Sequence, residues 1–134
     1  GETDLSGVKF VDGDRPGHQS IINTALRQEG QVGGRPYWTW YGFDNRVEWC
    51  AIFVSWCANQ DHVLNSSIPR FSVCSDGARW FVERGQWAKR GDTIPVAGDV
   101  IFFSWNADTT INHVGLVVGS HEPYVYFSVG AHQP

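Results

Sequence analysis

The sequence predicts an α+β domain in which N-terminal helices pack on a C-terminal antiparallel β-sheet. Before Pro95, apolar residues recur at the spacing of helix faces. After Pro95, the apolar runs are β-branched and aromatic and are separated by turn residues, as in strands. Helices that are segregated from strands along the chain are typical of the α+β class.

Three helices are expected in the first part of the chain. Residues 19–29 place apolar side chains at helical spacing and are followed by a glycine that would end the helix. Residues 49–60 contain neither Gly nor Pro and are apolar nearly all round, which indicates a buried central helix that begins at Cys50. Residues 76–84 have one apolar side and also precede a glycine.

Three strands are expected at residues 99–104, 113–118 and 124–129. A chain of 134 residues fits one domain, because a domain of this size buries roughly two thirds of the surface that its unfolded chain exposes. We therefore treat residues 1–134 as a single domain. Residues 1–17 mix Gly, Pro and charges without periodicity, and we interpret them as an extended N-terminal arm.

The segment between the first two predicted helices, residues 33–42, is rich in Gly and aromatic rings. We predict a loop that displays flat side chains, with Tyr37, Trp38, Trp40 and Tyr41 as candidates for contacts with a substrate. The alternative is that these rings fill the core.

Charge and hydropathy exclude several classes of partner. A net charge of −4 gives no electrostatic reason to bind nucleic acid or an anionic membrane surface. No apolar stretch approaches the roughly 20 residues that span a bilayer, so we expect a soluble protein that does not insert into membranes. The chain begins with Gly1 and has no Met, which suggests a trimmed or excised form. We expect a monomer.

The cysteines and histidines do not predict a metal centre. Three cysteines, Cys50, Cys57 and Cys74, show no paired zinc-ligand spacing, and the five histidines are scattered, so no metal and no other cofactor is expected. Three cysteines allow at most one disulfide and leave one thiol over. Cys57 fits a small core residue, and Cys74 could pair with it.

Cys50 is a candidate nucleophile because of its place at the start of a helix. The helix dipole and the free N–H groups there favour a thiolate, and the same groups can stabilise the oxyanion that forms on an attacked carbonyl. A buried structural cysteine is the alternative.

A nucleophilic cysteine needs a base, and His113 is the best placed of the five histidines. It stands at the head of a predicted strand, with Gly115 two residues on leaving room for a neighbour on the same side. The other histidines lie in loop or terminal segments. A structural role at the start of the strand is the alternative.

Three blocks in order closely resemble the CHAP domains of bacterial and phage cell-wall hydrolases, a papain-like family. These are residues 48–58 (EWCAIFVSWCA), 95–103 (PVAGDVIFF) and 112–117 (NHVGLV). Residues 22–26 (INTAL) also look like that family. The resemblance implies that Cys50 is the nucleophile, that His113 is the base, and that the substrate is peptidoglycan.

One feature departs from the family pattern. Its members usually carry an acidic or amide residue after the histidine strand to orient the imidazole, whereas Val129 stands at that position here. Glu122, Ser128 and His132 are candidate substitutes, and a Cys–His dyad without an orienting residue is also possible.

The resemblance implies an N-acetylmuramoyl-L-alanine amidase or a peptidoglycan endopeptidase that is secreted and acts at the cell wall or outside the cell. The missing acid motivates an alternative of another class, a catalytically silent module that binds wall peptide or a protein partner. A lysin, a housekeeping hydrolase, an interbacterial toxin and a conjugation component all fit the sequence equally.

Overall fold

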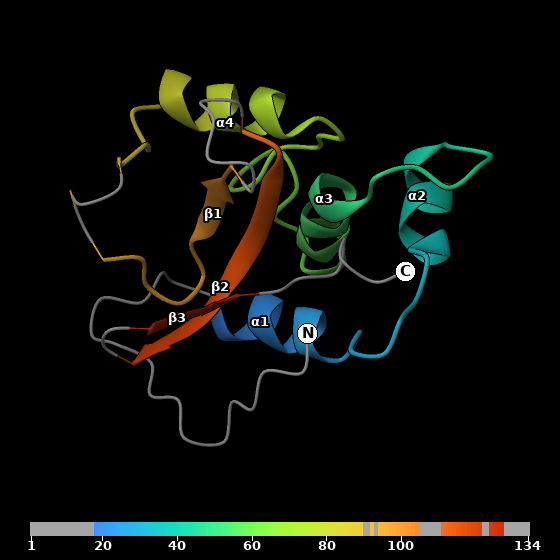
Figure 1. Ribbon diagram of the computed structural model, residues 1–134, viewed down its shortest axis with the longest axis horizontal. Coiled ribbons are helices and arrows are strands. Elements are labelled where there is room, and N and C mark those ends of the chain that lie inside the picture. Colours follow the sequence, from blue (N-terminus) through green and yellow to red (C-terminus); the bar gives the residue numbers. More distant parts are fainter. Residues whose placement is uncertain (1–17, 90–91, 93, 105–110, 122–123, 128–134) are drawn as a thin grey trace.

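The computed structural model describes residues 18–89, 92, 94–104, 111–121 and 124–127 (Figure 1). Four helices precede the strands: α1 (His18–Leu26), α2 (Arg35–Tyr41), α3 (Cys50–Gln60) and α4 (Cys74–Glu83). The strands are β1 (Val100–Phe103), β2 (His113–His121) and β3 (Tyr124–Phe127). The order of helices and then strands confirms the predicted α+β class.

The strands form one antiparallel sheet in the order β1-β2-β3, with β2 in the centre. Phe103, at the end of β1, pairs with His113, the first residue of β2. Pairing between β2 and β3 is irregular between Val117 and Gly119. The register therefore places His113, at the start of the central strand, beside the last residue of β1.

Helix α3 is the centre of the fold. It packs on β2 on one side and on α2 on the other, and α1 contacts both α3 and β2 (Figure 1). Such a helix has no solvated face for most of its length, which explains why its sequence is apolar nearly all round. Its buried residues are Cys50, Ala51, Ile52, Phe53, Val54, Ser55, Cys57 and Ala58.

The loop predicted over residues 33–42 is wrong, because residues 35–41 form α2. The glycines cap the helix rather than break it. Gly34 is the N-cap, with φ +72°, and Gly42 is the C-cap, with φ +120°. Both values lie in the region that favours glycine. Pro36 stands in the first turn, where its missing N–H costs nothing.

Helix boundaries differ from the predicted ones by a few residues, and one shift matters. Helix α4 begins at Cys74 rather than Asp76, while α1 ends at Leu26 rather than Glu29. Asp76 lies in the first turn of α4, where a carboxylate interacts favourably with the helix dipole. The earlier start places the Cys74 thiol at a helix N-terminus.

A buried hydroxyl holds the start of the α4 region against α3. Ser55 Oγ accepts a hydrogen bond from the Phe71 N–H at 2.9 Å, and its single proton can be donated to the carbonyl oxygen of Pro69, at 2.9 Å, or to that of Phe71, at 3.3 Å. Gly77, on the first turn of α4, packs so closely on the Phe71 ring that a Cβ there would overlap it. Helix α4 is thereby fixed relative to α3.

Gly34 sets the distance between α2 and the start of α3. A Cβ at Gly34 would overlap the Trp49 ring, and Trp49 directly precedes Cys50. Gly34→Ala is expected to lower the free energy of unfolding by about 3 kcal/mol, through the positive φ and the overlap together. Urea unfolding would measure this loss.

Gly33→Ala is the matched control for that prediction. Gly33 also has a positive φ, +81°, but nothing lies within 4 Å of a Cβ built on it. Its expected loss is about 1 kcal/mol, from the backbone alone. If Gly34→Ala and Gly33→Ala lowered the free energy of unfolding equally, the close approach of Gly34 to the Trp49 ring would not be what makes alanine unfavourable at position 34.

Candidate active site

Cys50 and His113 lie together where α3 meets β2. Cys50 begins α3 and is 8% exposed, whereas His113 begins β2 and is 2% exposed. The His113 ring makes an edge contact with Phe103, at 4.8 Å between ring centroids and 64° between ring planes. Strand pairing and this ring contact fix the imidazole beside the first turn of α3.

The pKa of the Cys50 thiol is lowered to about 4. The largest cause is a hydrogen bond with the Cys74 side chain, and burial acts in the opposite direction. A hydrogen bond with the His113 side chain, the charge of that side chain and a hydrogen bond with the Val114 backbone lower the pKa further. Cys50 is therefore a thiolate at neutral pH, the form that attacks carbonyl carbons.

Cys74 is the neighbour of this thiolate, with 3.7 Å between the Sγ atoms of Cys50 and Cys74. The hydrogen bond to Cys50 raises the pKa of Cys74 well above its usual range, and burial and the negative charge of Cys50 add to the effect. Of the two sulfurs, Cys74 therefore keeps its proton and donates it in the hydrogen bond.

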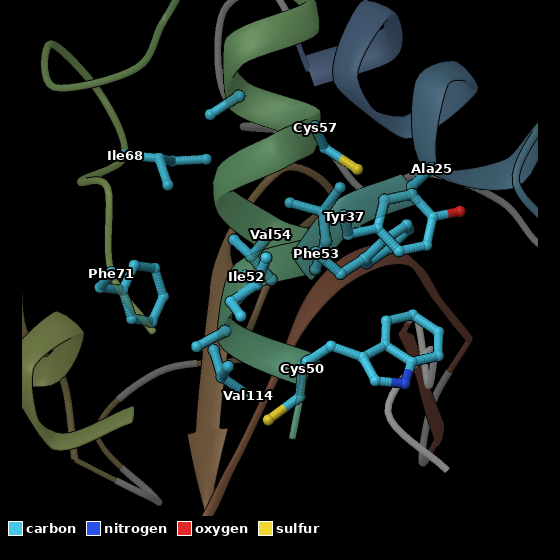
Figure 2. Close-up of a cluster of buried hydrophobic side chains, with 14 of the residues drawn as sticks. Ala25, Tyr37, Cys50, Ile52, Phe53, Val54, Cys57, Ile68, Phe71 and Val114 are labelled. Atoms are coloured by element: carbon cyan, nitrogen blue, oxygen red, sulfur yellow. The ribbon is translucent and has the colours of Figure 1, made fainter. Parts of the chain in front are cut away.

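The suggestion that Cys74 pairs with Cys57 is wrong, because Cys74 lies beside Cys50 and all three cysteines are free thiols. Figure 2 shows Cys50 at the first turn of α3 and Cys57 about two turns further along, among core side chains. Burial, and secondarily the charge of Asp61, raise the pKa of Cys57 well above its usual range. The structure thus gives Cys57 the core position that the sequence predicted.

Two of the four aromatic candidates lie in the core. The Tyr37 ring is fully buried, stacks on Trp49 at 5.2 Å, and makes edge contacts with Phe53 and Trp56 at 5.0 Å each. Its hydroxyl donates to Gln28 Oε1 at 2.8 Å, and burial raises its pKa to about 12. Trp38 is 8% exposed. Tyr37 and Trp38 therefore fill the core, which was the alternative to a contact with substrate.

Trp40 and Tyr41 are half-buried and reach the surface beside Arg70. The Arg70 guanidinium lies over the Tyr41 ring, 3.9 Å from its centroid, and 5.8 Å from that of Trp40. Its Nη2 donates to the Tyr41 carbonyl oxygen at 2.6 Å. This arrangement, which we call the Arg70 platform, comprises Trp40, Tyr41 and Arg70.

The candidates for a third catalytic residue, Glu122, Ser128 and His132, lie outside the described residues. Within the described ranges, no group of three or more His, Cys, Asp or Glu side chains could hold a metal ion. No helix in the described part of the chain is both long enough and apolar enough to span a bilayer.

Sequence reasoning did not place Cys74 or Arg70 at a site. The signal for Cys74 was the acidic residue two positions later, which suits the first turn of a helix and favours an earlier start than Asp76. Arg70 lies in an irregular segment, where sequence spacing gives no direction for a side chain.

The three thiols are expected to differ in reactivity. At pH 6 iodoacetamide should alkylate Cys50 first, because its pKa of about 4 lies below that pH and makes it a thiolate. The raised pKa values of Cys57 and Cys74 keep those thiols protonated and slow. Peptide mapping after a short exposure measures the order of labelling.

Lowering the pH provides a control for that experiment. Cys50 labelling should stay fast as the pH falls from 8 to 6 and slow only as it approaches the pKa of about 4. Labelling of Cys57 before Cys50, or a Cys50 rate that falls tenfold for each unit below pH 8, would contradict the lowered pKa.

In a comparison with protein families, the model described as the CHAP domain matches residues 40–130, which is more than half of the chain. The matched range includes both Cys50 and His113. Neither the comparison with curated proteins nor that with solved structures found a match.

Proposed function

The chain belongs to the CHAP family, whose members are usually cysteine-dependent hydrolases of peptidoglycan, and we propose that it cleaves an amide bond of that polymer. The bond is either the one between N-acetylmuramic acid and L-alanine or one within the stem peptide. Cys50 is the nucleophile and His113 the base in this proposal.

The observation that carries the proposal is the position of Cys50 at the start of a helix with His113 beside it. Cys50 stands at the N-terminus of an 11-residue helix, accepts hydrogen bonds from its surroundings as a thiolate, and has His113 as a hydrogen-bonding neighbour. A cysteine that only filled the core would have a raised pKa, as Cys57 does. The contrast between two cysteines of the same helix supports a reactive role for Cys50.

The proposed reaction is acyl transfer in two steps. The Cys50 thiolate attacks the amide carbonyl carbon, and N–H groups at the start of α3 stabilise the oxyanion. His113 gives a proton to the leaving amine, which breaks the C–N bond and leaves an acyl group on Cys50. His113 then takes a proton from water, which attacks the thioester and releases the carboxylate product and the thiolate. None of these steps uses a cofactor.

For substrate contacts we propose the Arg70 platform in place of the full set of four aromatic residues. Trp40 and Tyr41 have ring surface near solvent, and Arg70 adds a positive charge held in place by its hydrogen bond to Tyr41. Peptidoglycan stem peptides carry carboxylates, which a guanidinium binds through paired hydrogen bonds. Action on this substrate places the protein at the cell wall or outside the cell.

Digestion of purified peptidoglycan, followed by mass spectrometry of the soluble products, tests the function. An amidase releases intact stem peptides with a free L-alanine amine, and an endopeptidase releases muropeptides with shortened stems or opened cross-links. Binding to the wall without release of fragments would overturn the proposal and favour the catalytically silent module.

A further inference from the structure

Cys50 and Cys74 are brought together by parts of the chain that are separate in sequence. Each thiol lies at the first residue of a helix, and the sulfurs are 3.7 Å apart. They are in contact but not bonded. A disulfide requires the sulfurs to close from this contact distance to about 2.05 Å.

The packing around the pair keeps the two sulfurs in contact. The hydrogen bonds of the Ser55 hydroxyl hold residues 69–71 on α3, and Gly77 packs the first turn of α4 on the Phe71 ring. Moving the first turn of α4 away from Cys50 would therefore separate Gly77 from a Phe71 ring that is itself held on α3. The proximity is a property of the core rather than of a surface loop.

The two thiols also have complementary chemistry. Cys50 carries the negative charge and Cys74 carries the proton in their shared hydrogen bond. A thiolate is the form that reacts with peroxides, and a neighbouring thiol is what resolves the oxidised product. Cys50 is 8% exposed and Cys74 is 9% exposed, and the neighbours of Cys74 in sequence, Val73 and Ser75, are exposed.

We propose that Cys50 and Cys74 form a reversible disulfide, so that oxidation by a peroxide switches off the nucleophile and reduction by a dithiol restores it. The loss of activity in this statement rests on the proposed function, whereas the disulfide itself does not.

The oxidation proceeds in two balanced steps. The Cys50 sulfur attacks one oxygen of hydrogen peroxide, forming an S–O bond and breaking the O–O bond, and hydroxide leaves with the electron pair. The Cys74 sulfur then attacks the resulting sulfenic sulfur. An S–S bond forms, the S–O bond breaks, and the hydroxyl leaves as water with the Cys74 proton. A dithiol reverses the change by thiol–disulfide exchange and becomes a cyclic disulfide.

Without Cys74, peroxide would have a different outcome. The Cys50 sulfenic acid would lack a resolving thiol and would be oxidised further to sulfinic acid, which dithiols do not reduce. Cys74 therefore protects the nucleophile from permanent loss. Cys57 cannot take this role, because it lies about two turns along α3 among core side chains.

The test treats the reduced protein with hydrogen peroxide and measures intact mass, linked peptides and peptidoglycan hydrolysis before and after dithiothreitol. The expected wild-type result is a loss of about 2 Da, a peptide link between Cys50 and Cys74, and hydrolysis that disappears and returns. Cys57→Ala, the matched control, should form the same link.

Cys74→Ser should instead gain about 32 Da at Cys50 and stay inactive after dithiothreitol. A wild-type protein that gains oxygen without losing two hydrogens, or that links Cys57, overturns the inference. That readout does not depend on whether any variant folds. If the link forms but the reduced protein releases no wall fragments, the proposed function fails and the disulfide stands.

Discussion

Cys50→Ala is expected to lower the release of soluble peptidoglycan fragments by at least about 10³-fold, because it removes the thiolate that forms the acyl-enzyme and the neighbouring Cys74 has a raised pKa. The variant removes one sulfur atom from a position that is already 8% exposed, so the fold should persist. Product release from purified walls, followed over time, measures the effect.

Cys57→Ala is the matched control for this change. It removes the same atom from the same helix, about two turns away, at a fully buried position. It should lower the free energy of unfolding by about 1 to 2 kcal/mol and leave turnover unchanged. Wild-type rates from Cys50→Ala, or loss of turnover in folded Cys57→Ala alone, would reverse the assignment of the two thiols.

His113→Ala is expected to lower turnover by about 10³-fold, because the leaving amine loses its proton donor and the attacking water loses its base. A second effect distinguishes this role from a structural one. The His113 hydrogen bond and charge both lower the pKa of Cys50, so their removal raises that pKa. The alkylation rate of Cys50 at pH 6 should fall, and the midpoint of the dependence of that rate on pH should move to a higher pH.

His62→Asn is a suitable control for the histidine variant. His62 is exposed and has a positive φ of 61°, a conformation that Asn tolerates better than most residues. It should change neither turnover nor the reactivity of Cys50. An unchanged alkylation profile in folded His113→Ala would contradict the contact between the imidazole and the thiolate.

The elements that the sequence predicted well are those whose periodicity reflects burial. Helix α3 lies between β2 and α2, so its uniform apolarity was enough to predict a central helix and the place of Cys50 at its start. The head of β2 at His113 followed from a β-branched run and its turn residues. Cys50, the first residue of α3, and His113, the first residue of β2, form the candidate catalytic dyad.

The elements that the sequence did not predict depend on tertiary contacts. Helix α2 is only seven residues long, and its glycines were interpreted as loop residues although they cap it. Its Tyr37 ring lies in the core because Trp49, Phe53 and Trp56 surround it, and no spacing rule gives that contact. The closeness of Cys74 to Cys50 depends likewise on the hydrogen bonds of Ser55, which join segments distant in sequence.

The Ser55 hydrogen bonds also restrict how the connection between α3 and α4 can vary in length. Insertions are usually tolerated in such connections, because loops run over the surface. Here residues 69–71 are hydrogen-bonded to Ser55 in the core. A residue added or deleted between Phe71 and Cys74 would therefore move Gly77 away from its contact with the Phe71 ring. The exposed tip at residues 65–67 has no such attachment to α3 and is the place where length can change without moving a sulfur.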